Sequence, residues 1–594
     1  MSSNLTYVSA YLTIYKDTPP LGRDENWRLN HFKTLAETGI QLCVYVTPDN
    51  FDILQKLSVQ YPNVKVMDPI EINDTIAAKA LQEIGYENFT LPDNCRKDKD
   101  TVEYMIVQSS KTEFVQDATI KNPWNSTHFA WIDFSIAYMF GNVEKAQEQL
   151  RILGKSNFVS QFFAIPGCWS KLDLSVHYHY HLENIHWRFC GCFFLADKSS
   201  MQRFCRAYTD NFPEFVRSPR KLIWEVNYWA ILENTLSKDI WDPHWYAADH
   251  NERCLAVPVD YMCGPLQNIK SVEEVHYPKI TNYYHGSAAY VQDADGRHWL
   301  NTRLINYYFT DHGYYVYTDG TSQIKTKNSI SRIDVGEDES VSTDVTPTIA
   351  LVDFKEMDDA SVDLENLHPN TYSTGLEDVR LFMVEDQMYF IATNVNFSKT
   401  GRNRMVMGKY DPVNLVYSEC KRLVPPDPNS YIEKNWIPIV PRTRVKTDEQ
   451  NMDNLRFIYK WNPMEIGKLT RDTDDGLHLE IVESFQIQNP WFDRIRGSTT
   501  FLDTDNGFLG LVHFSEERSP RQYYHMFLLL DHETLRPIKY SQPFYFLSRS
   551  VEFCIGLAKI GGDYMCWVSR MDRDTVMITL SGDTVDSILC ENIV

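Results

Sequence analysis

The stretch His128-Phe-Ala-Trp-Ile-Asp133-Phe-Ser135 joins an apolar run to a single acidic residue. The run predicts a buried strand, and its abrupt end places Asp133 at the carboxyl end of that strand. In open α/β sheets, ligands bind beyond the carboxyl ends of the strands. Asp133 is therefore either a ligand-binding carboxylate or the N-cap of a following helix, and this stretch alone favours neither.

On the amino-terminal side of this stretch, strand-like and helix-like segments alternate. Apolar runs predict strands, and apolar residues at helical spacing predict the helices between them. This order is typical of a mainly parallel sheet with helices on both faces, so residues 1–258 are expected to form an α/β, Rossmann-like domain. The expected segments are a helix over 27–38, a strand over 42–46, a helix over 50–61, a strand over 64–67 and a helix over 102–118.

The pattern changes after about Val257 to short strands separated by turn residues. Asp505-Asn506-Gly507 lies between two apolar runs and is a strong hairpin signal. Two similar turns, at 411–415 and 531–535, are 120 residues apart, and a third turn, at 472–477, lies midway between them. This spacing suggests a period of roughly 60 residues, which allows four strands for each blade of a propeller. We expect a linker at 259–280 and an all-β five-bladed propeller at 281–594, with a pair of β-sandwiches as the alternative.

Composition limits the classes of partner. The formal net charge of −22 repels nucleic acid phosphates and anionic membrane surfaces, so neither is an expected partner. No apolar run is long enough to span a bilayer. No secretory signal is evident, so we expect a cytoplasmic location, the host cytoplasm if the chain is viral. The 12 cysteines form no Cys-x-x-Cys pair, and the closest two, Cys190 and Cys192, have no standard metal-site spacing.

Two further motifs in the first half have residues suited to binding sugars. Gly191, in the segment 188–195, would let the backbone approach a ligand closely, or would mark an ordinary bulge in a strand. Glu225 and Trp229 are four residues apart and would share one face of a helix. A carboxylate can serve as a base for an acceptor hydroxyl and a ring can stack on a sugar, whereas a core Trp with a surface Glu is the commoner arrangement.

Together these residues resemble the HtrL/YibB-type family of predicted glycosyltransferases, which has a GT-A-like fold. The resemblance covers about residues 5–255. It rests on Thr6–Tyr11, Lys111, Trp131-Ile132-Asp133, Gly191, Trp224-Glu225, Asn227 and Asp249-His250-Asn251.

The resemblance implies an enzyme that uses a nucleotide sugar, a UDP- or GDP-hexose, and a glycan or glycoprotein acceptor. Asp133 would be a catalytic residue that holds Mn²⁺ or Mg²⁺ together with His250, and Glu225 would be the general base. Nucleotide contacts are expected from Thr6, Ser9, Lys111 and Asp133, and acceptor contacts from Trp224, Asn227 and Trp229. The second acid of the Asp-x-Asp pattern is missing, which leaves metal dependence open.

The second half contains one sharp motif, Thr374-Gly-Leu-Glu377-Asp378-Val379-Arg380. Because neighbouring residues on a strand face opposite ways, Glu377 and Asp378 are not expected to line one pocket. Asp378 and Arg380 would share a face, where the arginine would keep the acid charged, although structural pairs of this kind are common.

This motif resembles the Gly-x-Glu-Asp-Pro-Arg motif of the β-mannoside phosphorylase and hydrolase family, whose fold is a five-bladed propeller that also occurs in mannosyltransferases. Val379 replaces the proline. The resemblance implies that Asp378 is the catalytic acid and that Glu377 and Arg380 contact sugar, with Asn435 and Trp436 as further candidates. Phosphorolysis also needs cations for inorganic phosphate. The candidates are Lys460, Arg496, His513, Arg521 and His525.

The leading hypothesis is a glycosyltransferase joined to a second carbohydrate-active module. One alternative is a single transferase activity with a propeller that only binds glycans. Another is phosphorylase or mannosyltransferase activity in the propeller beside a non-catalytic first module. The non-enzymatic alternative is a glycan-binding protein in which both sites have decayed.

Overall fold

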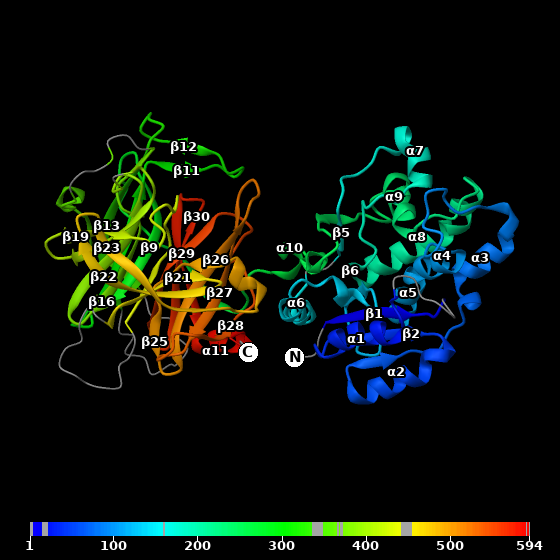
Figure 1. Ribbon diagram of the computed structural model, residues 1–594. Coiled ribbons are helices and arrows are strands. Elements are labelled where there is room, and N and C mark those ends of the chain that lie inside the picture. The colour runs from blue at the N-terminus through cyan, green and yellow to red at the C-terminus, as the bar shows by residue number, and fades with distance from the viewer. Residues whose placement is uncertain are drawn as a thin grey trace. The chain divides into compact units, whose positions relative to one another are not determined.

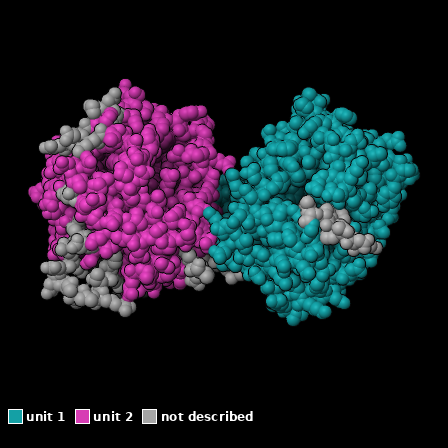
Figure 2. Space-filling model, in the orientation of Figure 1, with its two compact units in different colours: residues 1–264 teal, residues 265–594 magenta. Residues whose placement is uncertain are grey.

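The computed structural model describes residues 4–14, 22–158, 161–335, 349–364, 368, 372–398, 400–440, 454–589 and 591–592. The chain divides into two compact units, residues Met1–Gly264 and Pro265–Val594 (Figure 2). Unit 1 is α/β and unit 2 is built almost entirely of strands (Figure 1), which confirms the two expected fold classes. The stretch 259–280, expected as a linker, instead contains helix α10 (Val259–Met262) of unit 1 and strand β8 (Ile269–Glu274) of unit 2.

Unit 1 is organised around a sheet whose strand order is β3-β2-β1-β4-β6-β5-β7. Neighbouring strands are parallel from β3 to β4 and between β5 and β7, whereas β6 runs antiparallel to both β4 and β5. The strands are β1 (Leu5–Tyr11), β2 (Leu42–Val46), β3 (Val64–Val66), β4 (His128–Ile132), β5 (Phe163–Gly167), β6 (Phe193–Asp197) and β7 (His244–Ala247).

The helices of unit 1 begin and end mostly where polar residues can cap them. Asp24 accepts a hydrogen bond from the backbone of Trp27 at the start of α1. The segment 102–118, expected as one helix, contains two helices that are separated at Ser110. The hydroxyl of Ser110 donates a hydrogen bond to the carbonyl of Ile106, a contact that often bends a helix. The main helices are α1 (Glu25–Ala36), α2 (Pro48–Gln60), α3 (Ile76–Ile84), α4 (Val102–Ser109), α5 (Lys111–Lys121), α6 (Val143–Lys155), α7 (Leu174–Glu183), α8 (Lys198–Arg217) and α9 (Glu225–Thr235).

Helices cover both faces of this sheet. Val8 of β1 lies in one apolar cluster with Phe114 and Val115 of α5, while the hydroxyl of its neighbour Tyr7 donates to the carbonyl of Leu150 in α6. Because neighbouring strand residues face opposite ways, α5 and α6 pack on opposite faces. Among the described residues, none of the helices combines the length and apolar character that crossing a bilayer requires.

Unit 2 consists mainly of antiparallel strands, which in the described residues form four larger sheets and the two-stranded sheet of β11 (Tyr307–Phe309) and β12 (Tyr315–Tyr317). The second of the larger sheets has eight strands, because β19 pairs in parallel with β23 and so joins β16–β19 to β20–β23. The last sheet is closed by β8, which comes from the start of the unit and pairs with β31 from its end. The larger sheets contain β9 (Tyr284–Gln292), β10 (His298–Ile305), β13 (Ile324–Val335), β14 (Ile349–Glu356) and β15 (Ser373–Thr374); β16 (Glu377–Val384), β17 (Gln387–Asn394), β18 (Arg404–Asp411), β19 (Val416–Val424), β20 (Ile437–Ile439), β21 (Arg456–Trp461), β22 (Met464–Thr473) and β23 (Gly476–Phe485); β24 (Arg496–Gly497), β25 (Leu502–Thr504), β26 (Gly507–Glu516), β27 (Gln522–Leu530), β28 (Pro537–Tyr540) and β32 (Glu591–Asn592); and β29 (Glu552–Ile560), β30 (Asp563–Arg570), β31 (Asp574–Ser581) and β8.

Candidate active sites

A cavity of about 510 Å³ lies in unit 1 at the carboxyl ends of β1 and β4. The chain runs outward from β1 to β2 and β3 on one side and returns to β4 on the other, so the strand order reverses here. Ligands of open α/β sheets bind at this kind of switch point. The lining includes Tyr11, Arg23, Trp27, Lys111, Asp133, Tyr138, Trp187, Gly191, Trp224, Glu225 and His250.

The ammonium group of Lys111 organises the floor of this cavity. Its Nζ donates to the carbonyl of Gly191 at 2.8 Å and to Oε1 of Glu225 at 3.0 Å, and it lies 3.2 Å from Oδ1 of Asp133. Lys111 begins α5, Glu225 begins α9 and Asp133 follows β4. Three elements that are distant in sequence therefore place two carboxylates around one cation.

Lys111 is 3% exposed. Burial alone would lower its pKa, but the carboxylates of Asp133 and Glu225 outweigh burial and raise the pKa to about 12. An ammonium group has three N–H donors, and the three contacts of Lys111 match that number. In this structure the donors of Lys111 are therefore directed at the two carboxylates and at Gly191.

Asp133 is placed by its neighbours in a partly open position. The indole Nε1 of Trp131 donates to Oδ1 of Asp133 at 2.8 Å, and the backbone N–H of Asp133 donates to the carbonyl of Cys192. The side chain remains 39% exposed at the cavity. The following short helix (Ile136–Met139) has Ser135 at its N-cap, so the interpretation of Asp133 as a helix cap is wrong.

Glu225 is almost fully buried, and its position depends on Gly191. A Cβ atom on Gly191 would lie 2.4 Å from Oε1 of Glu225 and 3.2 Å from Nζ of Lys111. Only a residue without a side chain allows the backbone so close to this ion pair. Gly191 is therefore required by the site, and it lies just before β6 rather than in a bulge within a strand.

Thr6 and Ser9 do not reach the cavity. Both are fully buried within β1, and the hydroxyl of Thr6 donates to Ser126. The residues that line the cavity come instead from the carboxyl end of this strand and the segment after it. They are Ala10, Tyr11, Leu12, Thr13 and Ile14.

Of the three expected acceptor residues, only Trp224 lines the cavity. The amide of Asn227 donates to the carbonyl of His181, and it supports the fold. The ring of Trp229 packs edge-on against Phe194 and Phe204 in the core. The helix α9 is buried on all sides along its first two turns, so sharing a face with Glu225 does not bring Trp229 to the cavity.

One wall of the cavity contains residues that the sequence did not suggest. The guanidinium of Arg23 lies over the rings of Trp27 and Tyr138, at 4.9 Å and 4.3 Å from their centroids. Tyr11 stacks on Phe134 at 4.8 Å. Arg23 and Trp27 are four residues apart at the start of a helix, and this spacing is the sequence feature that could have predicted their contact.

His250 and Asp133 line the same cavity, and His250 also belongs to a group of side chains with metal-binding spacing. Among the described residues, the single group of His, Cys, Asp or Glu side chains with metal-binding spacing is Cys168, Cys190 and His250. Two members of this group are cysteines that lie 22 positions apart in the sequence.

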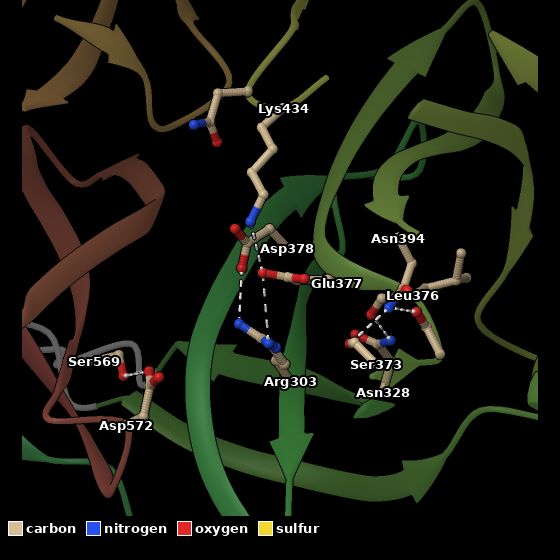
Figure 3. Close-up of polar contacts among 12 residues, drawn as sticks. Arg303, Asn328, Ser373, Leu376, Glu377, Asp378, Asn394, Lys434, Ser569 and Asp572 are labelled. Carbon is tan, nitrogen blue, oxygen red and sulfur yellow. Dashed lines mark hydrogen bonds and ion pairs between the residues drawn. The ribbon is translucent and has the colours of Figure 1, made fainter. Parts of the chain in front are cut away.

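Unit 2 contains a second group of buried charges, shown in Figure 3. Arg303 of β10 contacts both acids of the motif, with Nη1 at 3.1 Å from Oδ1 of Asp378 and Nη2 at 3.8 Å from Oε1 of Glu377. Lys434 reaches Glu377 from the other side, at 3.3 Å (Figure 3). Two acids and two cations thus meet in one place.

The expectation that Glu377 and Asp378 face opposite ways is wrong. Asp378 has a left-handed backbone, with φ of 54°, and the register between β16 and β17 shifts between Glu377 and Arg380. This bulge interrupts the alternation of side chains, so both carboxylates turn toward Arg303. Arg303 and Lys434 were not among the predicted site residues. Arg303 lies in β10 and Lys434 lies between β19 and β20, both far from the motif in the sequence.

Arg380 is a structural residue rather than the partner of the Asp378 carboxylate. It is 1% exposed and donates to the carbonyls of Ser498 and Asp378 and to the side chain of Asn435. Trp436 is fully buried and its indole donates to Glu433. Arg380, Asn435 and Trp436 therefore hold neighbouring segments together.

The charges in this second site affect one another. Burial raises the pKa of Glu377, but Lys434 and Arg303 lower it by more, and the net shift is downward. Asp572, which accepts a hydrogen bond from the hydroxyl of Tyr307 at 2.9 Å, has a pKa raised by burial. The pKa of Glu377 is therefore shifted down and the pKa of Asp572 is shifted up, a pattern that also occurs in pairs of catalytic carboxylates.

Of the expected phosphate-binding residues, Arg496, His513 and His525 lie beside one another on the paired strands β24, β26 and β27. Lys460 pairs with Glu465, and Arg521 pairs with Glu517. Burial lowers the pKa of His525 to about 3, and it also lowers the pKa of His513 well below the usual range. Burial therefore favours the neutral form of both histidines. Arg496 lies opposite His513 in the register of β24 and β26.

Comparison with known proteins gives one family match. Residues 6–206 match the family described as "Bacterial protein of unknown function (HtrL_YibB)". Lys111, Asp133 and Gly191 lie within the match, and Glu225 and His250 lie beyond it. No curated protein matches the chain.

Solved structures show likeness to about half of the chain, at low sequence identity. The β-1,2-mannobiose phosphorylase from Listeria innocua is 12% identical over 54% of this chain and 99% of its own, with a TM-score of 0.33. A mannose phosphorylase from Leishmania mexicana is 12% identical over 55% of this chain and 92% of its own, with a TM-score of 0.32. A GDP-Man-dependent mannosyltransferase from the same organism is 11% identical over 53% and 91%, with a TM-score of 0.33.

Proposed function

We propose that unit 1 is a GT-A-like glycosyltransferase that moves a sugar from a nucleotide sugar, a UDP- or GDP-hexose, to a glycan or glycoprotein. One observation carries the proposal: Lys111 holds Asp133 and Glu225 together on a cavity at the switch point of the sheet. Nucleotides bind at this position in related α/β sheets. The two carboxylates supply the groups that sugar transfer needs.

Asp133 is the residue that would hold a Mn²⁺ or Mg²⁺ ion. Such ions are commonly bound by one or two carboxylates together with the phosphates of the substrate, so a single partly exposed carboxylate fits. Bound there, the ion would neutralise charge on the departing diphosphate. The contacts from Trp131 and Lys111 both use Oδ1 and fix the orientation of the carboxylate.

Glu225 is the candidate general base toward the acceptor hydroxyl. Its carboxylate lies at the amino terminus of α9, where the helix dipole favours a negative charge. Lys111 is a positioning residue that neutralises the mutual repulsion of Glu225 and Asp133. Trp224 lies beside Glu225 on the cavity and offers a ring face to a sugar.

The wall formed by Arg23, Trp27 and Tyr138 suits the nucleotide. Aromatic rings stack on bases with about 1–3 kcal/mol for each base, and a guanidinium binds phosphate oxygens. All three residues line the same cavity as the carboxylates. The donor would therefore lie between this wall and Asp133.

The test is a nucleotide-release screen with the full chain, Mn²⁺ and a panel of UDP- and GDP-sugars. Asp133→Asn is expected to lower donor-specific release by at least about 100-fold, since it removes the carboxylate that faces the leaving group. Asp68→Asn, at an exposed surface position, is the matched control and should release nucleotide at the wild-type rate. Equal release by Asp133→Asn, or no release with any donor by folded protein, would refute the proposal.

We further propose that unit 2 is a five-bladed propeller with its own carbohydrate site. The predominance of antiparallel sheets and the closure of the last sheet by β8 support the architecture. The convergence of Glu377, Asp378, Arg303 and Lys434 supports the site, with Asp378 as the acid. A propeller that only binds glycans is the alternative.

A second assay separates these possibilities. The full chain is incubated with β-mannosides with and without phosphate, and sugar 1-phosphate and free sugar are measured. Asp378→Asn should abolish either product, whereas Asp386→Asn, in an exposed turn of the same strand pair, should not. Binding of the sugar without turnover would favour the glycan-binding alternative.

A further inference from the structure

We propose that unit 1 binds one zinc ion through Cys168, Cys190 and His250. The site borders the cavity, because His250 belongs to both, but it is separate from the Mn²⁺ or Mg²⁺ expected at Asp133. The inference does not depend on the proposed transferase activity.

The topology of the sheet brings the three residues to one edge. Cys168 directly follows β5 and His250 follows β7, and these two strands are parallel, so both residues lie at the carboxyl ends. Cys190 precedes β6, which is antiparallel to β5. The start of β6 therefore lies at the same edge as the ends of β5 and β7.

The two distances from Sγ of Cys168 to the other donor atoms match those of a tetrahedral zinc site. The Sγ atoms of Cys168 and Cys190 are 3.7 Å apart, and Sγ of Cys168 is 3.6 Å from Nδ1 of His250. With Zn–S of about 2.3 Å and Zn–N of about 2.0 Å, tetrahedral donors lie roughly 3.5–3.8 Å from one another. All three donor atoms fall within 4.8 Å of one another.

The backbone around the three ligands holds them in place. The N–H of Cys168 donates to the carbonyl of Trp187 at 3.0 Å, and the N–H of Cys190 donates to the carbonyl of Pro166 at 2.7 Å. The ring of Trp187 packs edge-on against His250, with 4.3 Å between centroids. Gly167 lets the chain before Cys168 lie close to the chain before Cys190, because a Cβ on Gly167 would lie 1.8 Å from the carbonyl oxygen of Arg188.

The chemistry of the donors selects the metal. Thiolate and imidazole are preferred ligands of zinc, whereas Mn²⁺ and Mg²⁺ prefer carboxylate oxygen. Two more thiols, Cys192 and Cys254, lie beside Cys190 and add to the sulfur-rich surroundings. A bound zinc ion would link the carboxyl ends of β5 and β7 to the start of β6. This link would lie next to Gly191, which contacts Lys111.

The experiment measures metal in the full chain, purified without chelators under reducing conditions. Elemental analysis is expected to give about one zinc per chain. His250→Ala and Cys168→Ser should each lower retained zinc by at least about tenfold, since each removes one of three protein ligands. Cys95→Ser is the matched control, because Cys95 is a partly exposed thiol outside the cluster, and it should retain zinc.

Cobalt substitution gives a second readout. Cobalt at this site should show a thiolate-to-metal absorption band in the wild type that is lost in Cys168→Ser. Folded, reduced protein without zinc, zinc retained equally by His250→Ala, or a Cys168–Cys190 disulfide would overturn the proposal. Because metal content is measured without substrate, these outcomes are independent of whether the transferase assay succeeds.

Discussion

Lys111 and Glu225 form a buried ion pair, with 3.0 Å between Nζ and Oε1, although 114 positions separate them in the sequence. A buried charge pair contributes little net stability, but removing one member leaves an uncompensated charge in a poorly solvated place. Replacing either Lys111 or Glu225 alone is therefore expected to destabilise the floor of the cavity.

Lys111→Met is expected to lower the free energy of unfolding of unit 1 by about 3–5 kcal/mol, because it leaves the buried carboxylate of Glu225 without its cation. Urea denaturation of the full chain, followed through the transition of unit 1, measures the loss. The double variant Lys111→Met/Glu225→Gln should regain most of it. Lys79→Met, at an exposed position, is the control, and an equal effect there would contradict the explanation.

Gly191→Ala should lower nucleotide release by at least about tenfold. The added Cβ would lie 2.4 Å from Oε1 of Glu225, so the carboxylate must move away from Lys111. The rate of nucleotide release, measured at saturating donor, tests this. Gly264→Ala is the matched control, since a Cβ there meets nothing within 4 Å and should leave the rate unchanged.

Glu113→Gln is expected to stabilise unit 1 at pH 8. Burial raises the pKa of Glu113 from 4.5 to about 7. Because the folded-state pKa is raised, stability falls as pH rises from about 4.5 to 7 and stays lower above that range. The glutamine removes this penalty while its oxygen can still accept the N–H of Ile76. We expect a gain of about 2 kcal/mol at pH 8, allowing for partial exposure.

The comparison of pH values is the control for Glu113. Near pH 4 the carboxyl is protonated in both folded and unfolded chains, so the variant and the wild type should unfold at the same urea concentration. A gain that is the same at pH 4 and pH 8 would show that the effect does not come from titration of Glu113.

Glu377→Gln should make unit 2 less stable at pH 7, with a smaller effect in acid. Lys434 and Arg303 lower the pKa of Glu377 despite its burial, so its contribution to stability is present at neutral pH and is lost as pH falls through the lowered pKa. Denaturation at pH 7 and below pH 4 measures the difference. Glu480→Gln, on the exposed side of β23, should show no such pH dependence.

The sequence was sufficient for features that depend on local pattern. An apolar run that ends in one acid placed Asp133 at the end of a strand, and the structure has it there. Alternation of segments predicted the α/β and all-β halves correctly. Local pattern failed where the backbone departs from the regular strand, because a left-handed residue such as Asp378 is not visible from its type.

Features that depend on tertiary packing could not be predicted from the local sequence pattern. Trp229 follows the periodicity of Glu225, but the neighbours that bury its ring, Phe194 and Phe204, come from other elements. Cys168, Cys190 and His250 come from three separate segments and have no regular spacing. The usable signal was that each lies at the end or the start of a strand, and pairing between strands decides which of these ends meet.

The pairing of β8 with β31 has a consequence for synthesis of the chain. Among the strands of unit 2, β8 leaves the ribosome first, yet its partner β31 begins only at Asp574. Unit 1 can complete its sheet as soon as β7 has emerged, since all seven of its strands come before residue 248. Unit 2 cannot complete this sheet until β31 has emerged, so a message interrupted before β31 would release a folded first half with an open-edged second half, a form prone to edge-to-edge aggregation.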